Sequence, residues 1–348
     1  MIRLVRRSLG VGGGGALLLA ALVLWPGAGE PAAAAARRVV AIGDVHGAIE
    51  SFSAMLQKTG LVDTKGRWTG GNAILVQTGD MTDRGAGMRA ALDLLMALEP
   101  QARKAGGRVH ALLGNHEIMN MVGEMRDANA AIFETFGGEA EMRVAFSARG
   151  RYGRWLRDHR VIEEVEGSVF LHGGINPEFS PGSIDDINRQ ARRELSEWDT
   201  GVRWLADRKL VERAPTFLEA IETAQAEAKR LIEGPLRDEP DTRQALATLL
   251  PLLNMGTSSL FSPDGPVWFR GFATWSDDEG DPRVTALLER FRGQRLVVGH
   301  TVQKAITERF DGRLFLIDTG MLGAPYFPSG RASALEITGD TTRPIYLD

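Results

Sequence analysis

The chain of 348 residues contains no cysteine, and this absence removes several kinds of chemistry. Without thiols there can be no disulfide bond, no thiolate metal ligand, no cysteine nucleophile and no lipid-modified cysteine. An excess of charge of either sign is also missing, because the formal net charge is only −4 at pH 7. Such a chain has no general attraction for nucleic acid or anionic lipid, and we expect neither as a partner. Any anionic substrate must be attracted locally, by bound cations or by a few arginines.

The N-terminal segment lacks an apolar run long enough to cross a bilayer, which takes about 20 residues. Its apolar stretch covers only residues 16–25, after three arginines within the first seven residues, and a tract of small residues follows at 32–36. This order is typical of a secretory signal peptide. We therefore expect residues 1–36 to direct export to the periplasm or the medium, with no stable membrane association after cleavage. An uncleaved N-terminal anchor is the alternative.

Five short runs rich in Val, Ile and Leu are each accompanied by glycine and by a residue of a metal-ligand type. They lie at residues 39–44, 74–80, 109–115, 169–174 and 296–300. Runs of this kind indicate strands that are buried on both faces. Helices are expected between the first of them, at 48–58 and 87–98. Alternation of strands and helices predicts an α/β fold whose functional loops meet at the carboxyl ends of the strands.

The remainder of the chain divides into a helical block and a late group of strands. We expect the late strands at 306–310, 313–317, 332–337 and 344–347, as a mostly antiparallel second sheet packed on the first. The helical block, residues 183–256, would be an insertion or a cap between two parts of the core, residues 37–182 and 257–348. A helical layer of the core itself is the alternative interpretation.

Within this block, Thr216 and Glu219 form a capping box that predicts a helix start, and Gly234 predicts its end. We expect one buried stripe on that helix and a later helix that Pro251 kinks or ends. The expected stripe consists of Leu218, Ile221, Ala224, Ala228, Leu231 and Ile232.

Six polar residues at the predicted strand ends could bind metal ions together. They are Asp44, His46, Asp80, Asn115, His172 and His300. Nitrogen and oxygen ligands without sulfur suit Mn, Fe or Zn. In the simplest arrangement Asp44 and His46 bind one ion, Asn115, His172 and His300 bind the other, and Asp80 bridges the two.

Such a site would keep a net positive charge even with a bridging hydroxide, because Asn115 is neutral. Arg84 adds a guanidinium whose fork matches phosphate oxygens. A hydroxide between two ions is a suitable nucleophile for in-line attack on a phosphate ester. His116 is the histidine of these loops without a metal role, and with Asp83 it could serve as the general acid.

Taken together, these motifs resemble the calcineurin-like metallophosphoesterases, and within them the phosphoprotein phosphatase branch. The motifs are Gly43-Asp44-Val45-His46-Gly47, Gly79-Asp80-Met81-Thr82-Asp83-Arg84-Gly85, Gly114-Asn115-His116-Glu117, His172-Gly173-Gly174 and Gly299-His300-Thr301. Residues 114–119, residues 267–271 and the long gap before His300 are most similar to the bacterial-type Shewanella-like phosphatases.

The resemblance implies a four-layer α-β-β-α sandwich of two mixed β-sheets flanked by helices, here with a helical insertion. It also implies two divalent or mixed-valence metal ions (Mn, Fe or Zn), the His116–Asp83 acid pair, and phosphate contacts from Arg84, Arg270 and Asn115. The sequence after His172 lacks the substrate-groove motifs of eukaryotic members, so no regulatory subunit is expected.

We therefore expect a metal-dependent phosphomonoesterase, in particular a protein phosphatase for Tyr, Ser or Thr. The substrate would be a phosphoprotein, a phosphopeptide or a small phosphoester, as for a general periplasmic phosphatase. Phosphodiesters and dinucleoside polyphosphates are the alternative, although the related tetraphosphatases typically carry Asp where this chain has Glu117. A metal-stabilised binding protein would have no need of His116, Asp83 and Arg84.

Overall fold

The computed structural model describes residues 36–179, 182–237 and 239–347. The expected signal peptide therefore lies almost entirely outside the described residues. Within those ranges, no helix combines the length and the apolar character that crossing a membrane requires.

The first β-sheet contains the three predicted N-terminal strands in parallel, and two antiparallel strands from the end of the chain extend it. Its strand order is β10-β9-β1-β2-β3. The strands are β1 (Val39–Ile42), β2 (Ile74–Gln77), β3 (Arg108–Ala111), β9 (Ser333–Thr338) and β10 (Thr341–Tyr346). Helices α1 (Ile49–Lys58) and α2 (Met88–Lys104) connect the parallel strands, as the alternating pattern predicts. Helix α2 extends beyond the predicted residue 98 and includes Pro100.

The second β-sheet has the order β4-β5-β6-β8-β7, with β5, β6 and β8 parallel and an antiparallel strand at each edge. Its strands are β4 (Ile162–Val165), β5 (Ser168–Leu171), β6 (Arg295–Val298), β7 (Thr307–Arg309) and β8 (Leu314–Leu316). The prediction that the late strands form their own antiparallel sheet is wrong. They divide instead, with β7 and β8 in the second sheet and β9 and β10 in the first.

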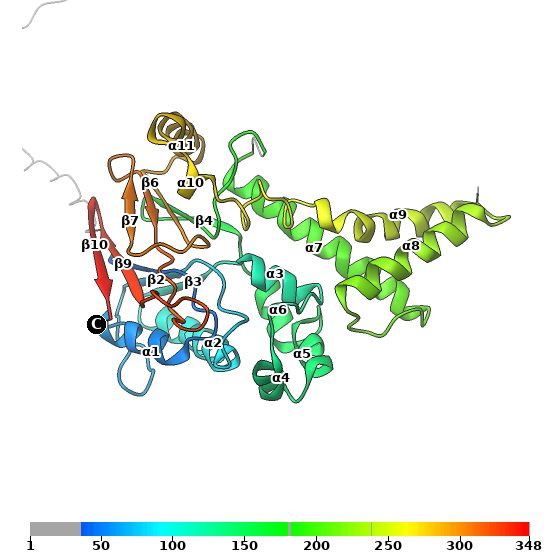
Figure 1. The fold of residues 1–348 in the computed structure, drawn as a ribbon, viewed down its shortest axis with the longest axis horizontal. Coiled ribbons are helices and arrows are strands. Elements are labelled where there is room, and N and C mark those ends of the chain that lie inside the picture. The colour runs from blue at the N-terminus through cyan, green and yellow to red at the C-terminus, as the bar shows by residue number, and fades with distance from the viewer. Residues whose placement is uncertain (1–35, 180–181, 238, 348) are drawn as a thin grey trace, which may run out of the picture. The chain divides into compact units, whose positions relative to one another are not determined.

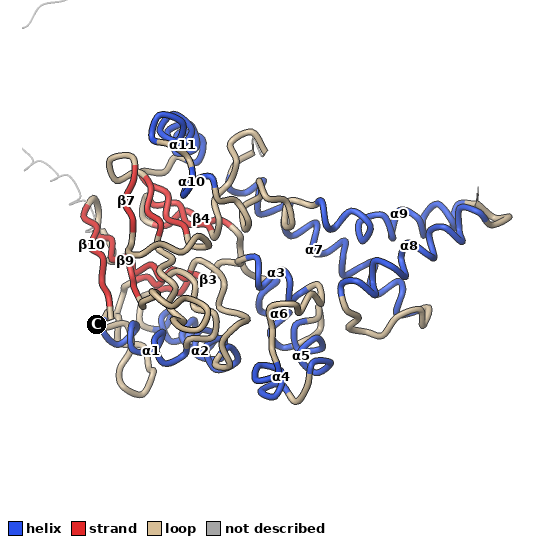
Figure 2. The backbone as a smooth tube through the Cα atoms, viewed as in Figure 1, coloured by secondary structure: helices blue, strands red, loops and turns tan. Residues whose placement is uncertain are grey.

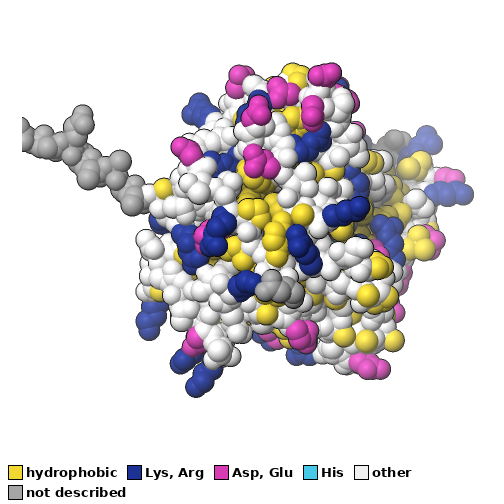
Figure 3. Space-filling view, turned by 60° about the vertical axis from the view of Figure 1, so that its left-hand side comes forward, with side chains coloured by type: hydrophobic (Ala, Val, Ile, Leu, Met, Phe, Trp, Pro, Cys, Tyr) yellow, Lys and Arg dark blue, Asp and Glu magenta, His cyan; other side chains and the backbone are white. Residues whose placement is uncertain are grey.

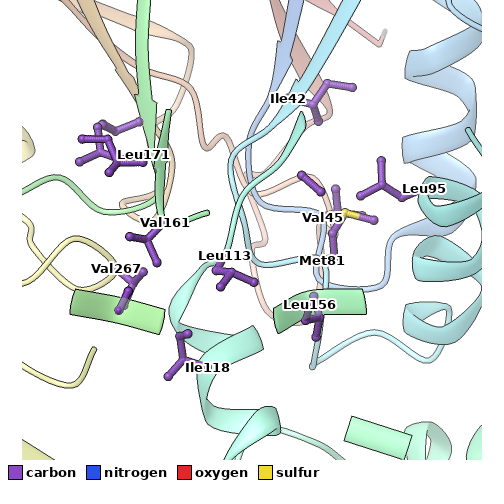
Figure 4. Packing of buried hydrophobic residues seen from close by; sticks show 14 of the residues in the cluster. Ile42, Val45, Met81, Leu95, Leu113, Ile118, Leu156, Val161, Leu171 and Val267 are labelled. Carbon is purple, nitrogen blue, oxygen red and sulfur yellow. The ribbon is translucent and has the colours of Figure 1, made fainter. Parts of the chain in front are cut away.

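The two sheets pack face to face between helices, so the four-layer arrangement is confirmed (Figure 1). Alternate residues of β1 explain the layering: Val39 and Ala41 belong to an apolar cluster that also contains Phe170 of the second sheet, whereas Val40 and Ile42 pack in the larger core. Figure 4 shows part of that larger core, with Leu113 and Ile118 just before and within the helix that follows β3. Every residue of β1 is buried, as expected for a central strand.

Helices make up most of the sequence between β3 and β4 and between β5 and β6 (Figure 2). The first group is α3 (Asn115–Met121), α4 (Ala130–Phe136), α5 (Glu139–Phe146) and α6 (Arg151–Arg157). The second is α7 (Ile184–Asp207), α8 (Phe217–Glu233), α9 (Pro240–Asn254), the 3₁₀ turn η1 (Met255–Thr257), α10 (Gly271–Thr274) and α11 (Asp277–Phe291).

Helix α8 has the predicted bounds, but its predicted buried stripe is only partly correct. Thr216 caps its N-terminus in a capping box, and Gly234 follows its last residue. However, Leu218 and Ile232 are 62% and 55% exposed, while Ala220 and Ala224 are buried. The stripe is displaced because Phe217 stacks on Trp198 of α7 and thereby sets which face of α8 is covered. Helix α9 continues past Pro251 to Asn254, so this proline does not end it.

Candidate metal and phosphate site

The polar loops at the carboxyl ends of five parallel strands meet at one place. Asp44 follows β1, Asp80 follows β2 and Asn115 begins α3 just after β3, so three loops come from the first sheet. The second sheet contributes His172 directly after β5 and His300 after β6. All of these side chains are buried. On the face shown in Figure 3, charged side chains surround a hydrophobic region, and none of the described histidines is visible.

Asp80 lies at the centre of the cluster, and its two oxygens have different surroundings. Oδ1 accepts a hydrogen bond from the backbone N–H of His116 at 3.1 Å. Oδ2 lies 3.2 Å from Nε2 of His172, 3.5 Å from Nε2 of His46 and 3.7 Å from Nε2 of His116. One carboxylate oxygen therefore faces the imidazoles of both sheets. This geometry suits a ligand that two ions share.

Three of the histidines use one ring nitrogen to bond a backbone carbonyl. Nδ1 of His46 lies 2.8 Å from the carbonyl oxygen of Thr82, and Nδ1 of His172 lies 3.0 Å from that of Thr78. Nε2 of His300 lies 3.1 Å from the carbonyl oxygen of Trp268. Because a carbonyl only accepts, each of these nitrogens carries the proton. The other nitrogen of each ring points into the cluster, where it can coordinate a cation when it carries no proton.

These inward-facing nitrogens converge with the oxygens of Asp80 and Asn115, as the ligands of a metal ion must. Nε2 of His172 lies 3.1 Å from Nδ1 of His300 and 2.9 Å from Oδ1 of Asn115. Burial opposes protonation of His172, but the charge of Asp80 and the hydrogen bond to it raise the pKa of His172 above its ordinary value. A divalent cation would take the place of that proton, and the donor set of N and O atoms suits Mn, Fe or Zn.

The shifted pKa values of the carboxylates in the cluster also indicate a site for cations. Burial and the neighbouring negative charges of Asp318 and Asp80 raise the pKa of Asp44 well above its ordinary value. Burial would raise the pKa of Asp80 too, but the surrounding histidines hold it well below the ordinary value. Ligand atoms of Asp80, His172 and His300 lie within 4.8 Å of one another, and those of Asp80, His46 and His116 form a second such group. Two cation positions that share Asp80 are therefore compatible with the structure.

His116 stands beside the cluster and is held by a buried acid. Its Nδ1 lies 2.8 Å from Oδ2 of Asp83, which is fully buried. Asn120 donates to both oxygens of Asp83 at 3.0 Å and to the carbonyl of His116 at 2.8 Å, which fixes the pair. Burial opposes protonation of His116, but the charges of Asp80 and Asp83 raise its pKa above the ordinary value. Its Nε2 faces the cavity, where it lies 3.2 Å from a nitrogen of the Arg84 guanidinium.

The site opens into a cavity of about 370 Å³ that carries both charge and apolar surface. Arg84 bonds the Nε2 atoms of both His46 and His116, and its guanidinium lies 5.3 Å from the Phe327 ring. The cavity lining comprises Asp44, Asp80, Arg84, Asn115, His116, Arg126, Asp127, Trp268, Arg270, His300, Val302, Asp318 and Phe327.

Arg270 lies where the sequence placed it, at the edge of the cavity. It is exposed and donates to the carbonyl of His300 at 2.9 Å and to Oγ1 of Thr301 at 3.1 Å. The cavity lining contains four aspartates and three arginines. A phosphate dianion would therefore be repelled until cations neutralise the carboxylates. Arg84 bonds the same lone pair of His46 that a metal ion would take, so the two compete for that nitrogen.

Two buried acids with contacts to the site were not among the predicted residues. Glu117 accepts hydrogen bonds from the backbone N–H groups of Asp80, Thr82 and Gly114 at 2.7, 3.1 and 2.8 Å, and from the hydroxyl of Thr82. It therefore holds the Asp80 loop against the start of α3. The sequence alone does not show this role, because the bonds join loops from different strands.

Asp318 is the second unpredicted acid, and it lines the cavity directly after β8. Its Oδ1 accepts from the N–H of Gly320 at 2.9 Å, while its buried Oδ2 has no hydrogen-bond partner among the described residues. A signal for it exists: Leu314–Ile317 is an apolar run followed by Asp and soon by Gly, the pattern of the five predicted loops. An unpartnered oxygen beside Asp44 is a further sign that the site is built for cations.

Backbone strain is concentrated in the same loops. Five of the ten non-glycine residues that adopt positive φ in the described chain belong to the site, namely His46, Asp80, Asp83, Arg84 and His300. Such conformations cost free energy and persist only where the surrounding structure imposes them. The glycines next to them allow close approach: a Cβ on Gly114 would lie 2.2 Å from Oδ1 of Asp80.

Comparison with known proteins agrees with this geometry. The sequence profile of a family described as calcineurin-like phosphoesterase matches residues 37–304. An uncharacterized protein of Schizosaccharomyces pombe is 30% identical over 315 residues, which cover 88% of this chain and 79% of that protein. Shewanella-like protein phosphatase 1 of Plasmodium berghei is 26% identical over 302 residues, covering 83% and 70%. Shewanella-like protein phosphatase 2 of Arabidopsis thaliana is 42% identical over 207 residues, covering 47% and 53%.

Among solved structures, the chain is similar to a cold-active protein tyrosine phosphatase. The TM-score is 0.62 at 25% identity, over 89% of this chain and 78% of that one. A crystal structure of the cold-active protein-tyrosine phosphatase of a psychrophilic Shewanella species gives a TM-score of 0.61.

Proposed function

The chain belongs to the calcineurin-like phosphoesterase family and is a hydrolase of phosphoester bonds, and from this premise we propose that it is a metal-dependent phosphomonoesterase acting on phosphoproteins. The observation that carries the proposal is the convergence of metal-acceptor atoms on Oδ2 of Asp80, with a held histidine and an arginine fork beside it. The expected ligands are Asp44, His46, Asp80, Asn115, His172 and His300.

Two divalent ions at this site would supply positive charge for the phosphoryl oxygens and an activated water for the attack. Asp80 would position both ions, and His46, His172 and His300 would hold them in orientations fixed by the backbone carbonyls.

The remaining roles belong to side chains that line the cavity. Arg84 and Arg270 would bind phosphate oxygens, with Asn115 beside them, and so neutralise the dianion in a fixed orientation. His116 would donate the proton from Nε2 to the leaving oxygen, while Asp83 holds Nδ1–H and stabilises the charged imidazole.

Phosphotyrosine is a substrate that suits the cavity at least as well as phosphoserine or phosphothreonine. Trp268, Val302 and Phe327 line the cavity beside the arginines and offer apolar contacts for a phenol ring. The similarity to a protein tyrosine phosphatase supports the same choice. Small phosphoesters are the second substrate class in this proposal. The export signal at residues 1–36 and the role of residues 183–256 as a cap remain predictions.

The first experiment compares substrates with the full chain reconstituted with Mn²⁺, Fe²⁺ or Zn²⁺. We expect hydrolysis of a phosphotyrosine peptide and an aryl phosphate, and little of a bis-aryl phosphate or a dinucleoside tetraphosphate. Predominant cleavage of the last two would overturn the monoesterase proposal.

The second experiment tests the acid pair with His116→Asn and Asp83→Asn. A general acid contributes roughly 10²–10⁴-fold, and it matters most when the leaving group is a poor one. We therefore expect a loss of that size on phenyl phosphate and a much smaller loss on 4-nitrophenyl phosphate, with metal content unchanged. Asp158→Asn, an exposed aspartate outside the site, is the matched control. Equal losses on both substrates would exclude His116 as the acid.

A further inference from the structure

A second cavity, of about 350 Å³, lies at the other end of the helix that serves the metal site. Helix α3 has Asn115 and His116 at its N-terminus, whereas Met121 at its C-terminus and the following residues line this cavity. The remaining walls come from α5, the loop after it, the C-terminal half of α7 and the loop before α8. None of the proposed catalytic or metal-binding residues contacts this space.

The floor of the cavity is apolar. Trp198 of α7, with Met121 and Val122, belongs to the buried core, and Val202 is partly buried against it. Ala206 and Pro215 continue the apolar lining toward the opening. An apolar floor of this kind favours a hydrophobic body over water, with a gain of about 25 cal/mol per Å² buried.

The rim of the cavity is cationic. Four arginines line it, Arg143, Arg149, Arg203 and Arg213, against two aspartates, Asp199 and Asp207. Asp199 is neutralised by Arg157, which bonds both of its oxygens at 2.7 Å, and Arg143 pairs with Glu139. The charged residues of the rim that remain are three arginines and one aspartate, which leaves a net positive charge. Arg149 and Arg213 are exposed and form no ion pair with any residue that the structure describes.

The walls of the cavity are tied to one another before any ligand binds. Arg157 bonds Asp199 of α7 and also donates to the carbonyl of Met121 at 3.2 Å, so it links α6, α7 and the end of α3. Arg143 donates from Nε to the carbonyl of Ala214 at 3.2 Å, which fixes α5 to the loop before α8. Preformed walls lower the ordering cost of binding.

We propose that this cavity is a binding site for a small amphiphilic organic anion, whose apolar body contacts Val202, Ala206 and Pro215 and whose acidic head pairs with Arg149 and Arg213. The volume falls within the range of small-molecule sites, about 300–1,000 Å³. A net positive rim above an apolar floor favours binding of an anion over binding of a cation that has the same apolar part. This inference is independent of the proposed phosphatase activity.

The test measures binding of decanoate and of 1-anilinonaphthalene-8-sulfonate to the full chain by calorimetry and fluorescence. Mn²⁺ and saturating inorganic phosphate are present throughout, so that the metal site is occupied. We expect one saturable site for each probe, with mutual competition. Decyltrimethylammonium, which has the same apolar body with the opposite charge, should not compete.

Variants of the cavity residues test whether the probes bind in this cavity. The double variant Arg149→Glu with Arg213→Glu should weaken decanoate binding at least tenfold, because it reverses two charges at the rim. Arg192→Glu, an exposed arginine of α7 outside the cavity, is the matched control and should bind as the wild type does. Ala206→Trp, which fills the space without a change of charge, should also abolish binding. Equal affinity in wild type and both cavity variants, or equal competition by decyltrimethylammonium, would overturn the proposal.

Discussion

At the scale of single residues, the site is organised by the atoms that are already bonded to the backbone. Each ligand histidine is fixed through one nitrogen, and Asp80 is fixed through Oδ1, so the free atoms can point only inward. The same logic makes Glu117 important although it does not line the cavity. Its carboxylate holds the peptide N–H groups that set the direction of the Asp80 loop.

Glu117→Gln should impair metal binding. A glutamine amide group would face backbone N–H groups that need an acceptor, so at least one of four hydrogen bonds is lost and the Asp80 loop shifts. Loss of such an outer partner typically reduces metal affinity or activity 10–100-fold, and we expect a reduction of about that size. Metal content after dialysis and kcat/KM for an aryl phosphate measure it. Glu134→Gln, on the exposed surface of α4, is the control, and equal metal retention in both variants would contradict the role.

Asp318 predicts a pH dependence in the metal-free protein. Burial raises the pKa of this carboxyl from 3.8 to about 6. Between these pH values the unfolded chain is ionised while the folded protein must keep the proton, so the free energy of unfolding falls as pH rises from about 4 to about 6. Asp44 contributes in the same direction. Burial lowers the pKa of His46 to about 3 and that of His300 to about 2, and these two groups contribute with the opposite sign in this pH range. The contribution of Asp318 is therefore measured as the change in pH slope between the wild type and Asp318→Asn in urea unfolding of the chelated protein. A variant with the wild-type slope would exclude Asp318 as its source.

At the scale of secondary-structure elements, the sequence predicts where a strand lies better than it predicts which strands pair. The runs that end in Asp44, Asp80 and His300 form strands because Val, Ile and Leu dominate them, and that property is local. Sheet membership of β7–β10 depends on pairing with strands that are distant in the sequence, such as β9 with β1 and β8 with β6, so local pattern could not assign it.

The same reasoning explains the residues that the sequence did not identify. Asp318 follows a strand of the predicted type, but its run was taken for part of a separate sheet, so its approach to Asp44 could not be foreseen. The stripe of α8 was misplaced because Trp198, a residue of another helix, decides which face is covered. The motifs could bring the six candidate ligands and the His116–Asp83 pair to one place because each motif lies in a short loop at the end of a strand.

The contact of α7 with α9 depends on the small size of Gly201. A Cβ at this position would lie 1.8 Å from Cδ1 of Leu252 and 3.1 Å from the carbonyl oxygen of Thr248. Gly201→Ala should lower the thermal unfolding temperature, because overpacking costs about 1–3 kcal/mol and exceeds the helix-propensity gain of up to about 1 kcal/mol. Gly256→Ala is the control, since no atom lies within 4 Å of its added Cβ. A Gly201→Ala protein as stable as the control would show that α9 can move away at no cost.

At the scale of the whole molecule, the metal site joins the two sheets. Asp44, Asp80 and Asn115 come from the first sheet, and His172 and His300 come from the second, so bound ions would contact both. Cations that bind the folded state alone stabilise it in proportion to the logarithm of their concentration.

Removal of metal should therefore lower stability as well as activity. At an ion concentration of 100 times Kd, the stabilisation is about 2.7 kcal/mol for each site. Calorimetric scans of chelated protein should show a lower unfolding temperature than scans after addition of Mn²⁺ or Zn²⁺. Asp80→Asn should respond much less to the ions, because the shared ligand loses its charge. An unchanged unfolding temperature in the wild type would mean that the site does not hold ions in solution.

The large sequence separation between residues of the site affects when the site can form during protein synthesis. The N–H of His300 bonds Oδ1 of Asp44, and 256 positions separate these two residues. A ribosome must therefore add His300 before the two parts of the site can meet. The site is completed late in biosynthesis, when the loops that carry His300 and Asp318 join those of the first sheet.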